Sequence, residues 1–217
     1  MSGEPLHFYG TRISTYMRIV SMIAVEKGAP FEVHPTDPKT AEHRKRHPFG
    51  RSPALEWQSP EGPVSLYESA AIGQFIDDTF GTPGALQPAD SLARAHMRRW
   101  ISMVDQYYFP VFEHEFFQPV LIARLTGQEP DLERARRAIG PMGLLLDIVD
   151  RELEAKPWLA GTEFSLADIW LGSVLEPFRL TNATHALITG RANLNRWFDQ
   201  ICSLACFQAT EHRFEEQ

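Results

Sequence analysis

The spacing of apolar positions in the first eighty residues switches between the two-residue period of a strand and the roughly 3.6-residue period of a helix. Leu6-His7-Phe8-Tyr9 has the every-second-residue pattern of a strand and ends at Gly10. Apolar residues follow the spacing of a helix from Ile13 to Lys27, and Gly28 is placed to end that helix. Both patterns then recur, and they predict a strand at 31–33, a polar helix at 39–46, strands at 53–57 and 64–67, and a helix at 68–79. The order β-α-β-α-β-β-α fits a small mixed sheet with helices packed on it.

The sequence changes character at residues 81–90, where Gly81, Pro83, Gly84 and Pro88 follow in quick succession. We place a linker there, between a domain of residues 1–80 and a domain of residues 91–217. Beyond the linker the pattern is helical, and it predicts helices at 91–124, 131–155, 165–178 and 191–208. Pro110 and Pro119 should kink or break the first of these helices. The predicted fold class is therefore α+β with two domains, the second an all-α helical bundle.

Composition and charge exclude several classes of protein. The chain has 217 residues, of which 43% are hydrophobic, so it can bury a sizeable core. Its net charge of -7 argues against nucleic acid as a ligand, because phosphate binding needs a basic face. Apolar runs are too short to span a bilayer, and residues 1–9 lack the pattern of a signal peptide. We therefore expect a cytoplasmic protein with no membrane or nucleic-acid partner.

Residues 47–55, His-Pro-Phe-Gly-Arg-Ser-Pro-Ala-Leu, place a proline at the opening of a strand. Proline cannot donate to the strand ladder, so Pro53 needs a reason to be there. A cis peptide bond between Ser52 and Pro53 would turn the backbone groups of the preceding residue towards a ligand. Pro53 could also serve the fold alone.

Residues 66–72, Leu-Tyr-Glu-Ser-Ala-Ala-Ile, place an acid and a hydroxyl where a strand leads into a helix. Backbone N–H groups and the helix dipole favour an anion there, while Glu68 can receive an ammonium group. With the strand edge beside Ser52, these groups suit a peptide with an amino-acid head. Alternatively, Glu68 and Ser69 could only cap the helix.

The two segments together resemble the glutathione site of cytosolic glutathione transferases, in which Asn-Pro-x-Gly-x-Val-Pro precedes Glu-Ser-x-Ala-Ile. The resemblance extends over almost the whole chain and implies a thioredoxin-like N-terminal domain. It implies that Ser52, beside Pro53, pairs through its backbone with the cysteinyl part of glutathione. Glu68 and Ser69 would hold the γ-glutamyl end. The sequence departs from the family at two positions, with His47 for the usual Asn and Ser52 for the usual Val or Ile.

Lys39 and Arg51 would lie near the glycine carboxylate of glutathione, if the resemblance holds there as well. Each could instead be an ordinary surface cation. No metal ligand set is expected from the sequence.

Residues 10–18, Gly-Thr-Arg-Ile-Ser-Thr-Tyr-Met-Arg, resemble the serine-type, bacterial-like members of that family. A hydroxyl at a helix N-terminus favours the thiolate form of a bound thiol. Ser14 is the candidate catalytic residue, donating its O–H to the glutathione sulfur. It could be an N-cap alone, and Thr15, Thr11 and Tyr9 remain rivals for the role. The segment has no cysteine, which argues against the cysteine-type branches.

Residues 107–117 are rich in aromatic side chains. The resemblance implies that such residues form the pocket for a hydrophobic co-substrate, with Tyr108, Phe109 and Phe112 as the candidates. Such side chains could equally form the core of the bundle or a dimer contact. Asp105 could reach the glutathione of a partner subunit, as an acid does in some relatives. Cys202 and Cys206, one helical turn apart, are expected to be a buried thiol pair.

The expected function is that of a homodimeric glutathione S-transferase acting in detoxification, with glutathione as co-substrate and a hydrophobic electrophile as second substrate. A glutathione-dependent isomerase, dehalogenase or peroxidase could use the same scaffold, as could a non-catalytic binding protein. In the C-terminal half, Ser165 and Asp168 have the spacing of a capping box, which we interpret as structural.

Overall fold

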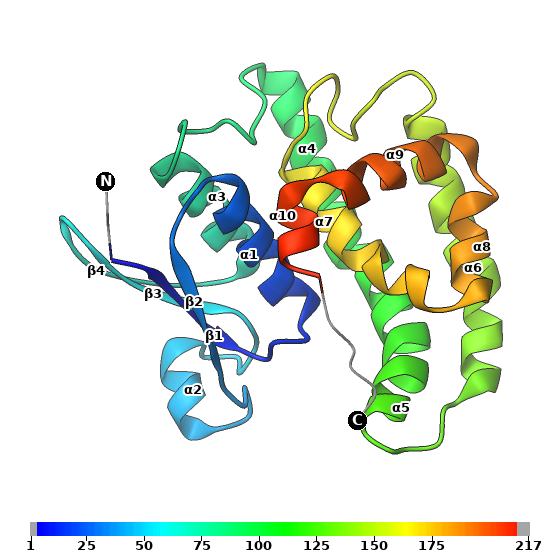
Figure 1. Ribbon diagram of the computed structural model, residues 1–217, viewed down its shortest axis with the longest axis horizontal. Coiled ribbons are helices and arrows are strands. Elements are labelled where there is room, and N and C mark those ends of the chain that lie inside the picture. Colours follow the sequence, from blue (N-terminus) through cyan, green and yellow to red (C-terminus); the bar gives the residue numbers. More distant parts are fainter. Residues whose placement is uncertain (1–3, 212–217) are drawn as a thin grey trace. The chain divides into compact units, whose positions relative to one another are not determined.

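A four-stranded mixed sheet organises the N-terminal part of the chain in the computed structural model, which describes residues 4–211 (Figure 1). The strand order is β2-β1-β3-β4, with β1 parallel to β2 and the other neighbours antiparallel. The strands are β1 (Leu6–Gly10), β2 (Phe31–Pro35), β3 (Ala54–Ser59) and β4 (Gly62–Tyr67). The helices of this part are α1 (Thr15–Glu26), α2 (Ala41–Arg46) and α3 (Ser69–Thr79). The predicted β-α-β-α-β-β-α order is confirmed.

Strand β1 has a buried face and a half-exposed face, as its alternating sequence predicts. Leu6 and Phe8 are fully buried, whereas His7 and Tyr9 are half-exposed. Helices α1 and α3 pack against one another, and α1 buries Ile19, Val20 and Ile23 completely. The apolar side of the sheet is thus covered, and polar side chains occupy the other side.

The segment that follows α3 is held by a buried ion pair. Lys27 Nζ lies 2.6 Å from Asp77 Oδ1, and both side chains are nearly inaccessible to water. Asp77 also accepts hydrogen bonds from the Leu86 amide at 3.1 Å and from Gln87 Nε2 at 3.1 Å. Removing one partner of such a pair would leave a buried charge uncompensated. These bonds keep residues up to Gln87 with the sheet, and the second compact unit begins at Pro88.

The final helix, α10 (Ala205–Ala209), belongs to the first unit although it follows the helical bundle in sequence. Arg18 on α1 is 2% exposed, donates to the Phe207 carbonyl at 3.0 Å, and stacks its guanidinium 4.0 Å from the Phe207 ring. The single helix expected at 191–208 is therefore wrong. It ends at Ser203, and extended backbone at Leu204 starts α10 separately.

This break also separates the two cysteines, because Cys202 lies on α9 and Cys206 on α10. Cys202 is half-buried and Cys206 is buried. Burial, with Glu26 nearby, raises the pKa of the Cys206 thiol to about 12. That thiol is therefore protonated at neutral pH and is a poor nucleophile.

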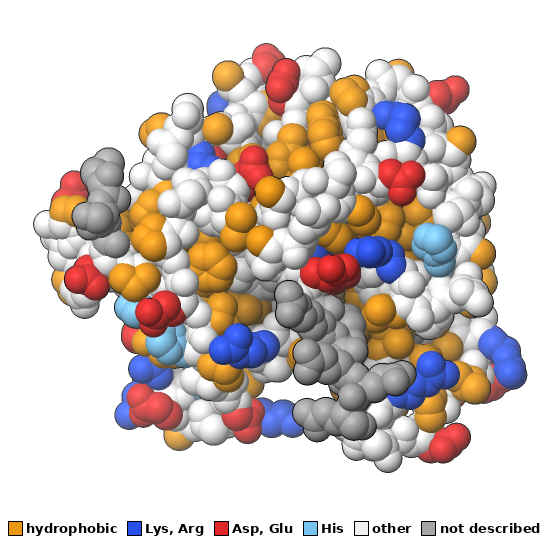
Figure 2. All heavy atoms as spheres, in the orientation of Figure 1, with side chains coloured by type: hydrophobic (Ala, Val, Ile, Leu, Met, Phe, Trp, Pro, Cys, Tyr) orange, Lys and Arg blue, Asp and Glu red, His pale blue; other side chains and the backbone are white. Residues whose placement is uncertain are grey.

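The second unit, residues 88–203, is helical, which confirms the predicted fold class. The long helices are α4 (Ser91–Met103), α6 (Leu132–Glu152), α7 (Leu166–Leu175) and α9 (Ala192–Ser203). The shorter elements are α5 (Ala123–Leu125), η3 (Glu176–Leu180) and α8 (Asn182–Thr189). Helix α8 was not predicted, since its eight residues are too few for the spacing of their apolar positions to indicate a helix. On the face shown in Figure 2, basic side chains lie among acidic and hydrophobic ones, without one continuous basic patch.

The chain between α4 and α5 stays helical through both prolines, with wider i→i+5 hydrogen bonding over η1 (Val104–Tyr108) and η2 (Pro110–Ile122). Of the two predicted outcomes, a kink or a break, the break does not occur at Pro110 or Pro119, and the helix instead changes its winding there. Proline lacks an N–H and crowds the carbonyl one turn earlier. The wider turn accommodates this crowding. None of the described helices is long and apolar enough to cross a membrane.

Asp168 organises the start of α7, and the predicted capping box with Ser165 is confirmed. Its carboxylate accepts hydrogen bonds from the Ser165 amide at 3.0 Å and the Ser165 hydroxyl at 2.9 Å. It also accepts from the Leu159 amide at 2.9 Å and from Trp197 Nε1 at 2.9 Å. Burial raises the pKa of Asp168 to about 6, against the opposing effect of these donors. One carboxylate thus joins α7, α9 and the loop before them.

Replacing Asp168 with alanine should destabilise the protein strongly, because it leaves buried donors without an acceptor. We expect the free energy of unfolding to fall by at least ~3 kcal/mol, since each unpaired buried donor costs roughly 1–3 kcal/mol. Urea unfolding followed by tryptophan fluorescence measures the change. Asp199→Ala, at an exposed position of α9, is the control and should change the midpoint little. Equal effects of the two substitutions would contradict this role of Asp168.

Candidate functional site

A pocket of about 530 Å³ opens where the parallel strands β1 and β2 end. Carboxyl ends of parallel neighbours meet at one edge of a sheet, and ligands commonly bind outside that edge. The pocket is lined by Gly10, Thr11, Arg12, Ile13, Pro35, Thr36, Asp37 and Pro38. The segment from β1 to α1 therefore forms one wall, and the segment after β2 forms another.

Gly10 and Ser52 make the closest approach in this region. The Ser52–Pro53 peptide bond is cis, as the position of Pro53 predicts. The Ser52 hydroxyl accepts a hydrogen bond from the Thr11 amide at 2.9 Å. A Cβ on Gly10, whose φ is 149°, would lie 1.7 Å from Ser52 Oγ, so only glycine fits at the end of β1. Serine in place of the usual valine thus has a structural reason.

Ser14 is the N-cap of α1 and is half-buried. Its amide donates to the Thr11 carbonyl at 3.1 Å, which ties it to the same turn that contacts Ser52. Its hydroxyl oxygen accepts from the Met17 amide at 3.4 Å, near the long limit for such a bond. The hydroxyl hydrogen is not used in this bond. Ser14 can therefore cap the helix and donate to a ligand at the same time.

The three rival hydroxyls have different surroundings. Tyr9 lies on the opposite side of the sheet from the buried Leu6 and Phe8, with the Arg46 guanidinium 4.2 Å from its ring. Burial and the neighbouring Glu56 raise the pKa of Tyr9. Thr15 is 7% exposed, and Thr11 lines the pocket. Thr11 is consequently the rival that best retains access to a ligand.

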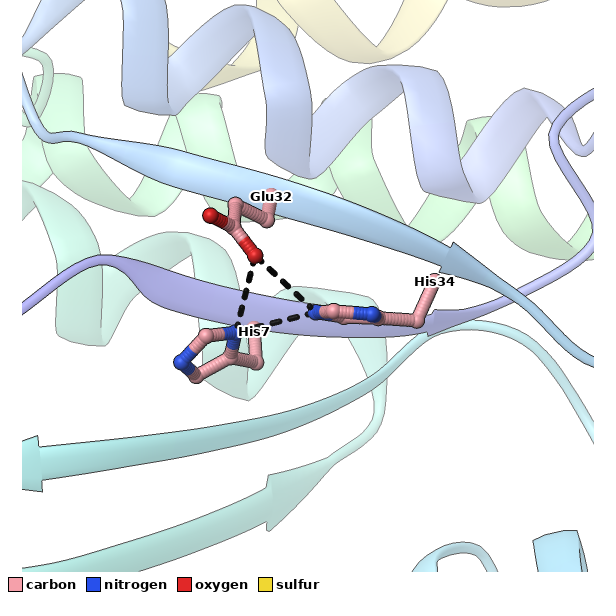
Figure 3. A group of neighbouring side chains, drawn as sticks. All are labelled: His7, Glu32 and His34. Carbon is pink, nitrogen blue, oxygen red and sulfur yellow. Dashed lines mark hydrogen bonds and ion pairs between the residues drawn. The ribbon is translucent and has the colours of Figure 1, made fainter.

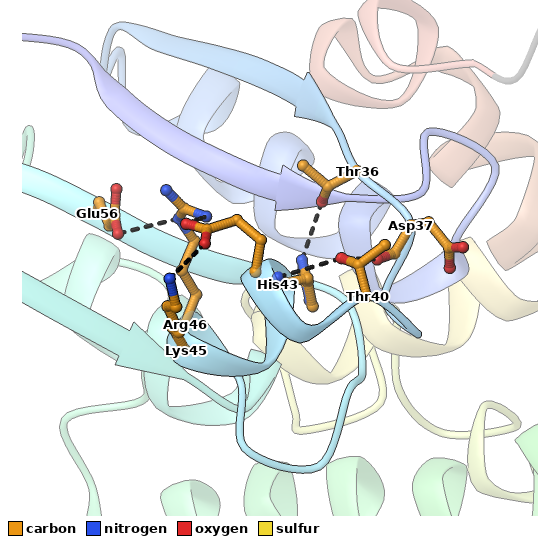
Figure 4. Close-up of polar contacts among 8 residues, drawn as sticks. Thr36, Asp37, Thr40, His43, Lys45, Arg46 and Glu56 are labelled. Carbon is orange, nitrogen blue, oxygen red and sulfur yellow. Dashed lines mark hydrogen bonds and ion pairs between the residues drawn. The ribbon is translucent and has the colours of Figure 1, made fainter.

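His43 on α2 contacts both the segment after β2 and the segment before Pro53. Figure 4 shows its bonds to Thr36 and Thr40. His43 is 1% exposed, and its Nε2 donates to the Arg51 carbonyl at 2.6 Å. In that tautomer its Nδ1 accepts from the Thr36 hydroxyl at 2.9 Å. Thr40 caps the same helix by accepting from the His43 amide at 3.2 Å. This buried imidazole thus links the pocket wall formed by the segment after β2 to the loop that contains the cis bond at Pro53.

Lys39 and Arg51 are both exposed, and a tight backbone contact brings their segments together. Gly50 has a φ of 60°, and a Cβ there would lie 2.8 Å from the Pro38 carbonyl oxygen. Lys39 directly follows Pro38 in sequence, and Arg51 directly follows Gly50, so the backbones of the two cations lie beside this contact. Cations on two neighbouring segments are suited to a carboxylate where both side chains turn towards it.

Glu68 adopts backbone angles that are rare for a residue with a side chain. Its φ is 72°, and it is the one described non-glycine residue with positive φ. It precedes Ser69, the first residue of α3, yet among the described residues its carboxylate makes no capping hydrogen bond. The carboxylate is exposed. Capping alone therefore does not account for Glu68, and unusual backbone angles at a fixed position point to a functional constraint.

The buried side chain of His47 lies next to Glu68. This side chain is 2% exposed, and its Nε2 lies 3.9 Å from Glu68 Oε1. Burial lowers the pKa of His47, and the nearby Glu68 charge opposes this effect only in part. The ring packs 5.1 Å from the ring of Tyr67, between centroids. A neutral imidazole thus replaces the amide that is usual at this position.

Comparison with known proteins agrees with this geometry. The family model of the glutathione S-transferase N-terminal domain matches residues 8–84, and that of the C-terminal domain matches residues 133–200. Glutathione S-transferase 3 of Zea mays is 30% identical over 95% of this chain and 93% of its own length. The chain belongs to the glutathione S-transferase family.

Other members of the glutathione S-transferase family agree with this assignment. Glutathione S-transferase F12 of Arabidopsis thaliana is 29% identical over 89% of this chain and 91% of its own length. The crystal structure of glutathione transferase F2 from Populus trichocarpa matches with a TM-score of 0.83 and 27% identity. That match covers 95% of this chain and 97% of the other. Both units therefore have the architecture of the family.

The expected co-substrate residues need a correction within this glutathione S-transferase fold. Tyr108 is fully buried, donates to the Leu145 carbonyl at 2.9 Å and packs edge-on against Phe112. Phe112 is 2% exposed and packs against Phe178 at 4.8 Å. Both side chains therefore belong to the core of the helical unit. Phe109 remains half-exposed, and Asp105 accepts a hydrogen bond from Trp170 at 3.2 Å.

Stability should depend on pH through His47, because its folded-state pKa lies below the ordinary value of 6.5. As pH falls past 6.5, the unfolded chain takes up a proton at this residue while the folded protein does not. The contribution of His47 to stability is thus present above pH 6.5 and is lost as pH falls below it. His47→Asn should flatten the fall in unfolding free energy between pH 7 and 5, as measured by urea titrations.

The exposed His185 on α8 supplies the control for this measurement. His185→Asn should leave the pH dependence of the native chain unchanged. A steep, unaltered pH dependence in His47→Asn would contradict the assignment.

Proposed function

We propose that the protein conjugates the glutathione thiolate to a hydrophobic electrophile. Its family membership supports the transferase activity and the use of glutathione. The observation that carries the proposal is the Ser14 hydroxyl at the N-terminus of α1, joined through Thr11 to the cis-proline loop. This arrangement offers one peptide-binding edge and one polarised hydroxyl beside it.

Glutathione would bind along that edge through groups at its two ends. The backbone of Ser52, held by the cis bond to Pro53, would pair with the cysteinyl part. The Glu68 carboxylate would receive the α-ammonium of the γ-glutamyl group, and the Ser69 hydroxyl and amide at the start of α3 would receive its carboxylate. Lys39 and Arg51, beside the contact of Pro38 with Gly50, would receive the glycine carboxylate.

Ser14 would lower the pKa of the bound thiol by donating its O–H to the sulfur. A free thiol has a pKa of about 8.5, and each unit of lowering corresponds to about 1.4 kcal/mol of preference for the thiolate. The positive end of α1 acts in the same direction. The thiol proton leaves to solvent, and a sulfur lone pair forms a bond to the electrophilic carbon. In a substitution the bond from that carbon to its leaving group breaks and the group departs with the electron pair; in an addition the π electron pair moves to the neighbouring atom, which takes a proton from solvent. The protein thus supplies thiolate population and orientation.

The surroundings of this reaction are also part of the proposal. Phe109, half-exposed on the helix between α4 and α5, is the remaining aromatic candidate for contact with the electrophile. We assign the chain to the cytoplasm, since the reduced thiols of Cys202 and Cys206 are suited to a reducing compartment. A role in detoxification would follow from conjugation of hydrophobic electrophiles. The native form would be a homodimer.

Ser14→Ala should lower kcat by about 10²-fold, the loss typical of removing one hydrogen-bond donor to a reacting anion. Binding of glutathione should change little, because the donors at its ends remain. Calorimetry measures the binding, a conjugation assay with an aromatic electrophile measures kcat, and ultraviolet titration measures the pKa of the bound thiol, which should rise. Thr181→Ala removes the N-cap of α8 in the same way and is the matched control for helix stability.

An unchanged thiol pKa in Ser14→Ala would assign the role to Thr11, which Thr11→Val would test. Absence of glutathione binding in the native chain would contradict the function itself.

Glu68→Gln should affect binding, whereas Ser14→Ala should affect kcat. We expect the affinity for glutathione to fall at least ~10-fold, because a charge-assisted hydrogen bond to the ammonium group is lost. The thiol pKa of the bound fraction should stay near the native value. Equal affinity of the variant and the native chain would remove Glu68 from the binding site.

Light scattering should give a mass of twice the 24.7 kDa chain. Phe49 in the cis-proline loop is 69% exposed and is a suitable apolar contact for a second subunit. Phe49→Ser should shift the mass towards that of the single chain. A native chain of single mass would contradict the homodimer.

A further inference from the structure

Three potential metal ligands converge on the sheet surface formed by β1 and β2, on the half-exposed side of β1 (Figure 3). His7 lies on β1, and Glu32 and His34 lie two residues apart on β2. In the parallel register His7 pairs with Glu32 and Tyr9 pairs with His34, so all three side chains project from the same face. Nothing in the proposed glutathione site uses these residues.

The ligand atoms lie close to the separations that a small divalent cation requires. His7 Nδ1 lies 2.9 Å from His34 Nε2, and Glu32 Oε2 lies 3.6 Å from His7 Nδ1 and 3.5 Å from His34 Nε2. The centre of such a triangle is about 1.9 Å from each corner, so an ion slightly above its plane reaches the roughly 2.0–2.2 Å of Zn–N and Zn–O bonds. For the tetrahedral geometry of Zn²⁺ the two nitrogens would move apart from 2.9 Å to about 3.3 Å and give up their mutual hydrogen bond, whereas Glu32 Oε2, at 3.5 and 3.6 Å from them, already lies near the required separation.

The donor set selects the class of metal. Two imidazole nitrogens and one carboxylate oxygen suit Zn²⁺ better than Mg²⁺ or Ca²⁺, which prefer oxygen ligands alone. The side chains are 30%, 58% and 38% exposed for His7, Glu32 and His34, so water can complete the coordination. We propose that His7, Glu32 and His34 bind one Zn²⁺ ion at the surface of the sheet.

Neighbouring side chains hold His34 in place for this role. The Tyr9 ring stacks on the His34 ring at 4.9 Å with an angle of 21°. Arg46 covers Tyr9 and is itself paired with Glu56 at 3.0 Å, which balances its charge. Such supporting contacts orient a ligand ring before the metal arrives. Without metal, the two imidazoles share a hydrogen bond whose donor depends on the tautomer.

The ion would join two strands that are far apart in sequence. His7 and His34 are separated by α1, and a metal bond between them adds a direct link from β1 to β2. The protein bound to Zn²⁺ should therefore unfold at a higher temperature than the metal-free protein. This site is independent of the proposed function, because none of its ligands is assigned to glutathione.

The test uses the full chain without an affinity tag, stripped of metal by a chelator and kept free of glutathione, whose thiol binds zinc. Calorimetric titration with Zn²⁺ should give one site per chain. His34→Gln and Glu32→Gln should each weaken binding at least 10-fold and abolish the rise in melting temperature. His185→Gln, at an exposed histidine of α8, is the matched control and should bind as the native chain does.

Titration with Co²⁺ gives a second readout, because its visible absorption bands report nitrogen and oxygen ligands directly. These bands should appear in the native chain and in His185→Gln but be lost in His34→Gln. Native affinity in both His34→Gln and Glu32→Gln would overturn the proposal, as would a native chain that binds no Zn²⁺. Circular dichroism of each variant establishes that it folds.

Discussion

The close approach of Gly10 to Ser52 is the constraint on which the N-terminal site depends. A side chain on Gly10 would occupy the position of the Ser52 hydroxyl, and that hydroxyl accepts the Thr11 amide. The end of β1 is thereby fixed against the cis-proline loop. From this contact the chain turns through Thr11 to Ser14, which begins α1. The hydroxyl proposed to activate the thiol and the edge proposed to bind glutathione are thus positioned by one packing contact.

The sequence predicts the parts of this arrangement that are determined locally. Alternation in β1, the cap at Ser14, the cis bond at Pro53 and the capping box of Ser165 with Asp168 each depend on a few neighbouring residues. The two glutathione motifs are local in the same sense. The family and its fold could be recognised from them before any contact across the molecule was known.

Contacts between distant segments could not be predicted in this way. The aromatic stretch at 107–117 is equally suited to a pocket and to a core, and the partner of Phe112 is Phe178, far along the chain. Arg18 on α1 donates to the Phe207 carbonyl and thereby holds α10 against α1. His43 has no motif of its own, although it joins Thr36 to the Arg51 carbonyl. Each outcome depends on a neighbour that the sequence does not place.

The proposed zinc ligands and the proposed glutathione site share strand β1 but depend on different properties of it. Alternation along β1 directs Leu6 and Phe8 into the core and His7 to the opposite side, while Gly10 ends the strand at the pocket. An ion held by His7 and His34 would fix β1 against β2, and both strands end at residues that line that pocket, Gly10 and Pro35. A link on one face of the sheet would therefore act on the glutathione site only through the rigidity of the strand ends. It would change stability more than chemistry.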